Sequence, residues 1–518
     1  MKLTGGEAIV EILNRFKVHY VFGLPGDQTH IHDAIYRNSD INHVLVRHEQ
    51  AAAHMADAYA RSTGKVGVCD ATVGPGATNL ISGIAEAFTS SIPVIALCSE
   101  IRSEWRGRGC LQEIQQVEVF KPITKSAFRV DVLKRIPEIM KWAFQTATTG
   151  KPGPVFLSFP LDVLKGEADF PEEEFEVHEQ FGRFPGLRFL PPEEELVEAL
   201  DMFRSSKKPI ILCGGGVISS GAWTQVQRLA ETLGVPVATT FMGKGSLPEN
   251  HPLCLGPFGL LGRPVANQWV TDADFIFAVG TRFTNIDTAA WTVPRPGVPI
   301  VQIDIDPEEI GKNYHVKKGL VGDAKSVLFA MIRIVENTVD VKKRAFYQFS
   351  EIERVHRQWL LEKGIESPLA GQHSSPVHPL QVIKALRSHM GAEDVIICDS
   401  GFNQIWGGQY FEVNSSGRKY MGPRGFGVMG FSLPAAIAAK VASPERKVVA
   451  LCGDGGFAMT LQELETAIRI GAPVIVCIMN NLNMEYVKAN QRNLYESRFI
   501  SVDFSDIDYA KVARAFGC

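Results

Sequence analysis

The sequence predicts an α/β protein with three doubly wound domains whose sheets are mainly parallel. Short apolar runs and helix-like stretches alternate along the 518 residues, which is the pattern of strands that crossover helices bury on both faces. Two segments interrupt this alternation, an acidic and proline-containing one at 169–192 and a serine- and proline-rich one at 367–379. They divide the chain into predicted domains at 1–168, 190–340 and 375–518.

The composition limits the kinds of partner and the compartment. A hydrophobic content of 45%, a charged content of 21% and a net charge of −4 are typical of a globular protein that binds neither nucleic acid nor membrane. Residues 4–16 alternate polar and apolar positions as an amphipathic helix, not as a signal peptide. The nine cysteines form no CxxC pair, so we expect reduced, mainly buried thiols in a cytoplasmic protein.

The stretch VVALCGDGGF at 448–457 places Asp454 at the end of a predicted buried strand. Thr460 and Glu463 fit a capping box for the helix that follows, and the next buried strand, PVIVCIM, leads to Asn481. The segment lacks the lysine of a P-loop and the glycine pattern of a dinucleotide site. Carboxylate and amide oxygens at neighbouring strand ends, facing a phosphate, suit Mg²⁺. We therefore predict a metal-bound diphosphate here, with a structural turn aspartate as the alternative.

The first predicted domain contains a segment similar to the one around Asp454. VGVCDATVGPG, a helix-like stretch and PVIALC follow one another as VVALCGDGG, a helix-like stretch and PVIVCIM do. Gly76 and Pro93 are 17 positions apart, and so are Gly456 and Pro473. This match favours two sheets of the same topology, although any two βαβ units could share the spacing.

The middle domain has features of a nucleotide-binding fold. PIILCGGG, which contains Gly214, opens a helix, and VPIVQIDIDPEE places acidic residues such as Asp304 at a strand end, where a ribose hydroxyl could bind.

A further motif, RHEQAAAHMADAYAR, places Glu49 between a strand and an alanine-rich helix, where burial would raise the pKa of its carboxyl group. On its own this residue fits a charge at a helix N-terminus better than a catalytic group. Together with GPGATN, GDGG, the asparagine pair and GFGVMGFSLPAA, it resembles the thiamine diphosphate (ThDP) enzymes of the acetohydroxyacid synthase and pyruvate decarboxylase superfamily. The resemblance covers nearly the whole chain. The order of VFGLPGD, RHEQ, GKPGPV and DIDPEEIGKN is most similar to acetolactate synthase large (catalytic) subunits.

This resemblance implies a role for each domain and a set of site residues. The first domain would bind the pyrimidine of ThDP, the third its diphosphate with Mg²⁺, and the second would be a Rossmann-like central domain. Glu49 would hydrogen-bond the pyrimidine and relay its proton, with Asp27 and Gln112 as further candidate catalytic residues. The implied cofactor contacts are Glu49, Gly76, Asn403, Gly427, Met429, Gly453, Gly455, Gly456 and Asn481. The implied Mg²⁺ ligands are Asp454, Asn481 and Asn483. For Met429, ordinary core filling is the alternative.

The resemblance also implies a reaction and an assembly. The expected reaction is decarboxylation of a 2-oxoacid such as pyruvate, with ligation of the product to a carbonyl acceptor. Because such enzymes bind the cofactor between two subunits, a homodimer is the minimum and a homotetramer is expected; a regulatory subunit is left open. The chain ends on YAKVARAFGC, where these enzymes continue through another strand and a C-terminal arm, so we expect the third domain to be incomplete at its end.

Several positions depart from a biosynthetic acetohydroxyacid synthase. Asp27 stands where those enzymes have glycine and resembles the LPGD of decarboxylases, although it could instead cap the next helix. The histidine pair of decarboxylases is replaced around Gln112, which matches synthases and benzaldehyde-lyase-like carboligases. Ile286 and Asn490 replace the arginine and tryptophan that shape the pocket for a second 2-oxoacid. A non-ligating decarboxylase, a carboligase or lyase, an acyl transferase and a ThDP-binding protein without turnover therefore stay as alternatives.

The middle domain departs from the family in its flavin-binding motif. GTRFTN lacks the acidic residues that usually follow its arginine, so we do not expect bound FAD. Gly214, Arg282 and Asp304 leave another nucleotide open.

Overall fold

The computed structural model describes residues 1–37, 40–337, 354–355, 358 and 376–518. They form two compact units. Unit 1 combines Met1–Leu187, Asp399–Gly401 and Gly422–Cys518, whereas unit 2 combines Arg188–Cys398 and Phe402–Met421. The predicted boundaries at 340 and 375, and positions 367–375 of the second predicted linker, lie outside the described residues. The division into 1–168, 190–340 and 375–518 stays a prediction.

The N-terminal part of unit 1 is built on a six-stranded parallel sheet in the order β3-β2-β4-β5-β7-β6, accompanied by an antiparallel pair of β1 and β8. Its elements are β1 (Lys2–Thr4), α1 (Gly5–Arg15), β2 (Tyr20–Gly23), α2 (Thr29–Arg37), β3 (Asn42–Leu45), α3 (Glu49–Thr63), β4 (Gly67–Ala71), α4 (Pro75–Thr89), β5 (Val94–Glu100), α5 (Gln116–Phe120), β6 (Ser126–Arg129), α6 (Ile136–Thr148), β7 (Val155–Pro160), α7 (Leu161–Lys165) and β8 (Glu167–Asp169).

Helices cover both faces of this sheet. Val68 and Leu97 join the core formed with α1, α2 and α6. Gly67 points the other way, because neighbouring residues of a strand alternate between faces, and a Cβ atom there would lie 2.1 Å from the Ala56 carbonyl oxygen of α3. Burial on both faces explains why β4 and β5 are apolar runs rather than alternating ones.

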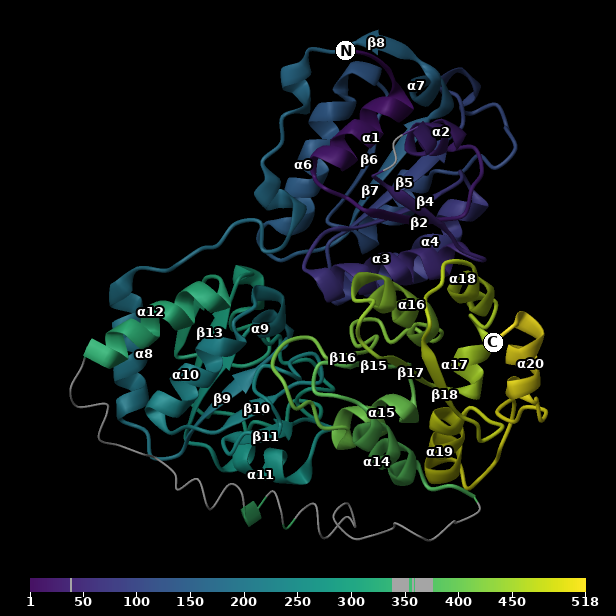
Figure 1. The fold of residues 1–518 in the computed structure, drawn as a ribbon. Helices are drawn as coiled ribbons and strands as arrows, with labels where there is room; N and C mark the ends of the chain where they lie inside the picture. Colours follow the sequence, from purple (N-terminus) through teal and green to yellow (C-terminus); the bar gives the residue numbers. More distant parts are fainter. Residues whose placement is uncertain (38–39, 338–353, 356–357, 359–375) are drawn as a thin grey trace. The chain divides into compact units, whose positions relative to one another are not determined.

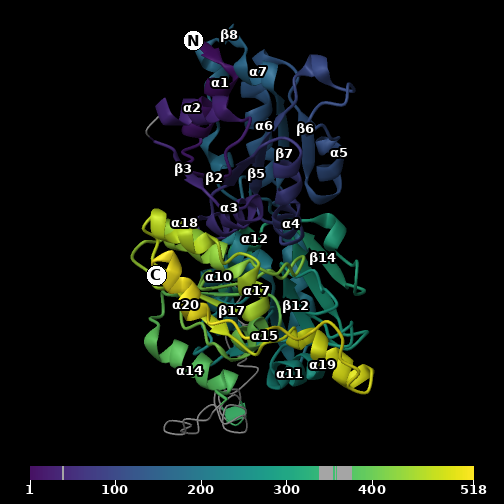
Figure 2. The same cartoon turned by 90° about the vertical axis from the view of Figure 1, so that its right-hand side faces the viewer.

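The C-terminal part of unit 1 contains a parallel pair of β17 and β18. Its elements are α16 (Ser432–Ala442), β17 (Val448–Gly453), α17 (Asp454–Ala458), α18 (Glu463–Arg469), β18 (Ile475–Met479), α19 (Glu485–Leu494) and α20 (Tyr509–Phe516). Helix α16 packs against α3 (Figure 1), and α20 lies beside α18, as the turned view also shows (Figure 2).

Unit 2 has its own six-stranded parallel sheet, in the order β11-β10-β9-β12-β13-β14, around a core that includes Ile211, Phe277 and Ile303. A short parallel pair, β15 and β16, belongs to the same unit. Its elements are α8 (Glu193–Arg204), β9 (Pro209–Cys213), α9 (Gly215–Ser220), α10 (Trp223–Leu233), β10 (Val237–Thr239), β11 (Cys254–Pro257), α11 (Pro264–Asp272), β12 (Phe275–Val279), β13 (Ile300–Asp304), β14 (Lys318–Val321), α12 (Ala324–Asn337), α14 (Pro379–His389), β15 (Val395–Cys398), α15 (Phe402–Tyr410) and β16 (Tyr420–Met421).

The parallel sheets and their crossover helices confirm the predicted α/β doubly wound class. No disulfide joins any of the nine cysteines, all of which lie in the described ranges. None of the helices in these ranges combines the length and the apolar character that a membrane span requires.

Two local predictions around Asp454 are wrong. The predicted capping box does not form, because the Thr460 hydroxyl donates to the Gly430 carbonyl at 3.1 Å and the Glu463 carboxylate accepts from the Arg47 backbone N–H. The predicted helix after the glycines is α18, which begins at Glu463 with no side-chain cap. Strand β18 is not buried either: Ile475 is 51% exposed, since β17 is the only strand paired with it in the described ranges of unit 1.

Candidate functional site

Asp454 is the first residue of α17 and follows β17 directly, as the sequence predicts. It is 2% exposed, and its Oδ2 atom is buried without a hydrogen-bond partner among the described residues. Burial raises the pKa of this carboxyl group, while hydrogen bonds from the backbone of Gly455, Asp454 itself and Leu482 oppose the rise. A buried carboxylate oxygen that receives no proton is available to ligate a cation.

The asparagines predicted as metal ligands lie on the segment that reaches Asp454. The backbone of Leu482 hydrogen-bonds the Asp454 carboxylate, so its two neighbours stand at the same strand end. The Asn481 side chain donates to Asn483 Oδ1 at 3.3 Å, and the Asn483 side chain donates to the Asn481 carbonyl at 2.7 Å. One carboxylate and two amide side chains form an oxygen-rich set that fits Mg²⁺. We name Asp454, Asn481 and Asn483 the Asp454 cluster.

The glycines before and after Asp454 allow a close approach of neighbouring groups. Gly453 is the N-cap of α17. A Cβ atom at Gly455 would lie 3.1 Å from the Phe504 ring, and one at Gly456 would lie 3.0 Å from Asp399 Oδ1. The turn is thus packed on its inner side and has no side chains of its own at the two glycines, which suits a diphosphate. Asn403, the other predicted diphosphate ligand, is buried in α15 of unit 2, and its role stays a prediction.

Glu49 is the first residue of α3 and is buried. Its Oε2 atom accepts a hydrogen bond from the Asn79 side chain of α4 at 2.9 Å. A Cβ atom at Gly76 would lie 3.2 Å from Glu49 Oε1 and 2.8 Å from Thr72 Cγ2, so the glycine makes room for the carboxylate. Asn79 was not predicted as a site residue, although GPGATN contains it.

Asp27 and Gln112 flank the same turn, at residues 72–76. The backbone N–H of Asp27 donates to the Thr72 hydroxyl at 3.1 Å. Gln112 has a φ of 66°. A Cβ atom at Gly74 would lie 2.5 Å from the Gln112 carbonyl oxygen. The Asp27 side chain is exposed and accepts no hydrogen bond from the described residues, so it does not cap α2 there. We name Asp27, Glu49, Gly76 and Gln112 the Glu49 cluster.

The loop with Gly427 and Met429 is tied to the helices that carry the Glu49 cluster. The buried Glu86 carboxylate of α4 accepts backbone N–H groups of Gly425, Phe426 and Gly427 at 3.2, 2.9 and 3.1 Å. At the other end of the loop, the Gln50 side chain donates to the Met429 carbonyl at 3.4 Å. Glu86 was not predicted from the sequence, because the loop residues that it holds are more than 300 positions away and no local pattern signals them.

Asp399 joins the two glycine segments and was also missed. Its carboxylate accepts the backbone N–H of Gly430 at 3.0 Å and of Ser432 at 2.9 Å, and it lies against Gly456. Burial raises the pKa of Asp399, and these hydrogen bonds oppose the rise. Asp399 therefore fixes the loop of Met429 relative to the turn of Gly456.

Glu463 connects α18 with the segment before Glu49. Its carboxylate accepts the Arg47 backbone N–H at 3.0 and 3.2 Å and the Thr466 hydroxyl at 2.7 Å. Burial raises the pKa of Glu463 to about 7 against these hydrogen bonds. The residue predicted as half of a capping box instead holds the backbone that leads to Glu49.

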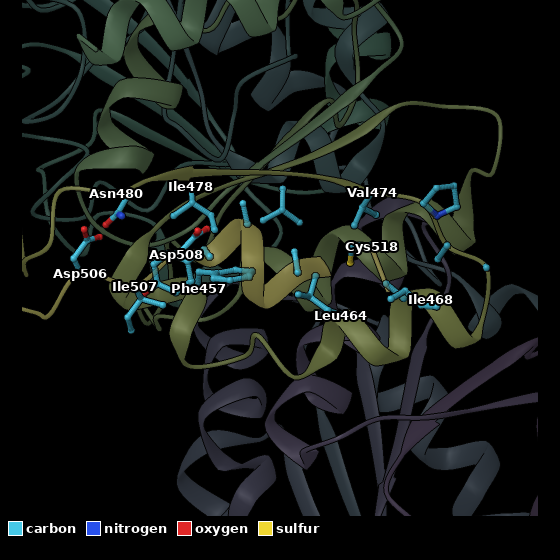
Figure 3. A pocket seen from close by; sticks show the side chains of 18 residues that line it. Phe457, Leu464, Ile468, Val474, Ile478, Asn480, Asp506, Ile507, Asp508 and Cys518 are labelled. Atoms are coloured by element: carbon cyan, nitrogen blue, oxygen red, sulfur yellow. The ribbon is translucent and has the colours of Figure 1, made fainter. Parts of the chain in front are cut away.

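The Glu49 cluster and the Asp454 cluster have different hydrogen-bond partners in the described residues. No hydrogen bond or ion pair joins Glu49 to Asp454 or Asn481 within the part of the chain that the structure describes. A cavity of about 990 Å³ lies beside β18 and α20 (Figure 3), but its wall includes neither Asp454 nor Glu49. The cavity is lined largely by apolar side chains such as Phe457 and Ile478, so we do not assign the cofactor to it.

In unit 2, the predicted nucleotide features have a packing explanation. A Cβ atom at Gly214 would lie 2.1 Å from the Gly280 carbonyl oxygen, so this glycine allows two neighbouring strand ends to meet. The Asp304 side chain accepts the Asp306 backbone N–H at 3.0 Å. Binding of another nucleotide in this domain stays a prediction.

Comparison with known proteins identifies the family of this chain. Models of thiamine pyrophosphate enzymes match the chain three times: the N-terminal TPP-binding domain at residues 3–119, the central domain at 196–331 and the C-terminal TPP-binding domain at 399–518. The chain belongs to the thiamine pyrophosphate enzymes. Both clusters lie in segments that match the TPP-binding domains, which confirms the predicted resemblance.

Relatives within this family are similar along the full chain. A probable acetolactate synthase large subunit of Methanococcus aeolicus is 38% identical over 526 residues, which cover 99% of this chain and 87% of the relative. The corresponding protein of Methanocaldococcus jannaschii is 39% identical over 528 residues (99% and 86%). The acetolactate synthase of Mycobacterium leprae is 35% identical over 529 residues (100% and 82%). The chain is thus a thiamine pyrophosphate enzyme similar to acetolactate synthases.

Proposed function

We propose that this enzyme binds ThDP through Mg²⁺, decarboxylates a pyruvate-like 2-oxoacid and ligates the product to a carbonyl acceptor. The observation that supports it most directly is the retention of two buried carboxylates with different surroundings in a chain similar to acetolactate synthases. Glu49 is hydrogen-bonded by Asn79, and Asp454 has an oxygen with no donor. A protein that only stored the cofactor would not need the first of them.

Different residues would bind the metal, the diphosphate and the aminopyrimidine. Asp454, with the side chains of Asn481 and Asn483, would hold Mg²⁺, because hard oxygen ligands suit this ion. Gly453, Gly455, Gly456 and Asn403 would hold the diphosphate. The loop of Gly427 and Met429, which Glu86 and Gln50 hold in place, would contact the aminopyrimidine.

Glu49 would provide the proton transfer. When bound, ThDP supplies the nucleophilic carbon that adds to the 2-oxoacid carbonyl and the electron sink that lets carbon dioxide leave. Glu49 would donate a hydrogen bond to the pyrimidine ring and exchange a proton with it. Its burial at the N-terminus of α3, with one oxygen bonded to Asn79, holds the carboxyl group in one orientation for this transfer.

We further propose that the pyrimidine and the diphosphate are held by different subunits. No hydrogen bond or ion pair links Glu49 to Asp454 or Asn481 in the described residues, which is consistent with a site completed by a second copy. A homodimer is then the minimum active form, and a homotetramer is the expected one.

Product analysis tests the proposed reaction. Purified protein is incubated with ThDP, Mg²⁺ and pyruvate, with and without an added aldehyde, and the products are identified by mass spectrometry. We expect carbon dioxide together with acetolactate or a mixed acyloin. Binding of ThDP without any release of carbon dioxide would instead support a binding protein without turnover.

The exposed Asp27 favours a second candidate, a decarboxylase that releases an aldehyde. Its carboxylate has no hydrogen-bond partner in the described residues and flanks the turn against which Glu49 lies. Two unit charges about 5 Å apart repel by roughly 3 kcal/mol at an effective dielectric constant of about 20, on the order of a hundredfold in binding. A neutral aldehyde should therefore be preferred to a second 2-oxoacid as acceptor.

The variant Asp27→Gly separates the two candidates. We expect it to raise acetolactate relative to acetaldehyde and mixed acyloin, because it removes both the repulsion and a proton donor. An unchanged product ratio with a lower melting temperature would assign Asp27 a structural role only.

A further inference from the structure

Two histidines and an aspartate converge in the N-terminal part of unit 1, away from the residues discussed above. His32 comes from α2, His43 from β3 and Asp70 from β4. His32 Nε2 lies 2.7 Å from Asp70 Oδ2, and His43 Nε2 lies 3.2 Å from Asp70 Oδ1. One ligand atom from each residue lies within 4.8 Å of the other two. We name these three residues the His–Asp cluster.

The sheet is built to let the carboxylate reach the histidines. Strand β2 lies between β3 and β4, and Gly23 of β2 is paired with Asp70. A Cβ atom at Gly23 would lie 1.5 Å from Asp70 Oδ1, so only glycine leaves room for the carboxylate to extend over β2 toward His43. The cluster is therefore a specific arrangement of four positions in three neighbouring strands and one helix.

A positively charged neighbour would stabilise the buried carboxylate of Asp70. The side chain is completely buried, and the ion pairs recorded for it in the described residues are with His32 and His43, not with a lysine or an arginine. A buried carboxylate requires compensation by an opposite charge and by hydrogen bonds. The histidine side chains are 16% and 14% exposed, so solvent and small ions can reach their edges while Asp70 stays enclosed.

The donor set selects a class of ion. Two imidazole nitrogens and one carboxylate, with a further position open to water, are ligands that Zn²⁺ uses at sites with three protein ligands. Imidazole suits zinc and its neighbours in the first transition row, whereas Mg²⁺ prefers oxygen and retains water. The His–Asp cluster and the Asp454 cluster would therefore prefer different metals.

We propose that His32, His43 and Asp70 form a binding site for a zinc-class divalent cation, separate from the Mg²⁺ position at Asp454. An ion there would join α2, β3 and β4. The turn in which the Asp27 backbone donates to the Thr72 hydroxyl begins two residues after Asp70. The site depends on none of the assignments made for ThDP.

Cobalt binding tests this site without any measurement of activity. Full-length protein is stripped with a chelator, kept in excess Mg²⁺ without ThDP, and titrated with Co²⁺, which takes the ligands of Zn²⁺ and absorbs visible light in a low-coordinate site. The exposed Cys518 is replaced by serine in every sample, so that its thiol does not bind the ion. We expect one Co²⁺ per chain with a visible band that Zn²⁺ removes.

Matched variants assign the ligands. Asp70→Asn and His32→Gln should each weaken Co²⁺ binding by at least tenfold. His30→Gln, on the same helix but outside the cluster, and Asp454→Asn, at the other metal position, should leave it unchanged. Circular dichroism confirms that each variant is folded.

The unaltered histidines provide a check that does not depend on the variants. X-ray absorption at the zinc edge of the Zn²⁺-loaded protein should report two imidazole ligands per ion. A protein that binds no stoichiometric Co²⁺ or Zn²⁺, binding that persists in the folded His32→Gln variant, or an absorption spectrum without imidazole would overturn the proposal. The cluster would then be a hydrogen-bonded network only.

Discussion

The segments β4-α4-β5 and β17-α17-α18-β18 share a parallel strand pair and a sequence pattern, yet they differ in helix continuity and in the burial of the last strand. α4 is one continuous helix and β5 is buried along its whole length between β4 and β7. The second segment has two short helices and a half-exposed last strand. In the first, Asn79 satisfies the nearby carboxylate of Glu49; in the second, one oxygen of Asp454 has no donor.

This difference indicates two uses of one topology. The first segment is packed so that a single carboxyl group is held in a defined orientation, which suits the transfer of a proton. The second leaves one oxygen of a buried carboxylate without a donor and its last strand partly exposed, which suits the capture of an ion and the phosphate bound to it. Substitution of the two carboxylates should therefore give different defects.

Asp454→Ala, in the more exposed of the two segments, should cause the largest change. It removes the charged ligand from a set whose other members are neutral, so we expect no measurable metal-dependent binding of ThDP. Isothermal titration calorimetry with and without Mg²⁺ measures this, with the exposed Asp506→Ala as control. Equal affinity in Asp454→Ala and the parent would refute the metal assignment.

Glu49→Gln should alter the rate while leaving most of the cofactor affinity. The amide can still form hydrogen bonds but cannot exchange the proton, and loss of general acid–base catalysis typically costs about 10²–10⁴-fold. Nuclear magnetic resonance of hydrogen exchange at C2 of bound ThDP measures the affected step, with the exposed Glu118→Gln as control. Exchange at the parent rate would show that Glu49 does not relay the proton.

Glu86→Gln should weaken the link between the two halves of unit 1. One amide oxygen replaces two carboxylate oxygens, so at least one of the three backbone donors loses its partner, at a cost of about 1–3 kcal/mol. We expect faster amide exchange at residues 425–427 and an apparent affinity for ThDP lowered by roughly tenfold. Exchange that is unchanged in this loop, compared with the exposed Glu104→Gln, would show that Glu86 does not position it.

Glu463 should produce the smallest effect, a dependence of stability on pH. Its pKa is raised from 4.5 to about 7 in the folded protein, so between these values the folded state binds more protons than the unfolded state. Stability should therefore fall as pH rises, by about 1 kcal/mol per pH unit near pH 6. Urea unfolding from pH 5 to 8 measures the slope, which Glu463→Gln should remove. An equal slope in both proteins would contradict this assignment.

The sequence predicted what local patterns encode. The strand before Asp454, the helix that begins at Glu49 and the parallel sheets all follow from runs of apolar residues and their periods. The capping box at Thr460 and Glu463 was wrong because both side chains have partners distant in sequence, at Gly430 and Arg47. Competition between a local partner and a distant one cannot be judged before the distant segment is placed.

Burial and support contacts were harder to predict for the same reason. PVIALC and PVIVCIM are nearly identical in pattern, but β5 has a strand on each side and β18 has one in the described residues. Glu86 and Asp399, which hold the glycine segments, carry no motif because their function depends on backbone groups of other segments. The roles assigned to the site residues stay predictions until the variants are measured.

The contact of Glu86 with residues 425–427 also has a consequence for the order of folding. Its partners lie 339 to 341 positions later in the chain, so the carboxylate has been synthesised long before the ribosome makes the loop. During that interval Glu86 is exposed to water or is bound by Arg61 of the neighbouring helix. Because domains generally fold as they emerge, the N-terminal sheet can form early, whereas the loop acquires its shape only when both ends of unit 1 have met. An ordered loop is thus a sign that synthesis has passed residue 427.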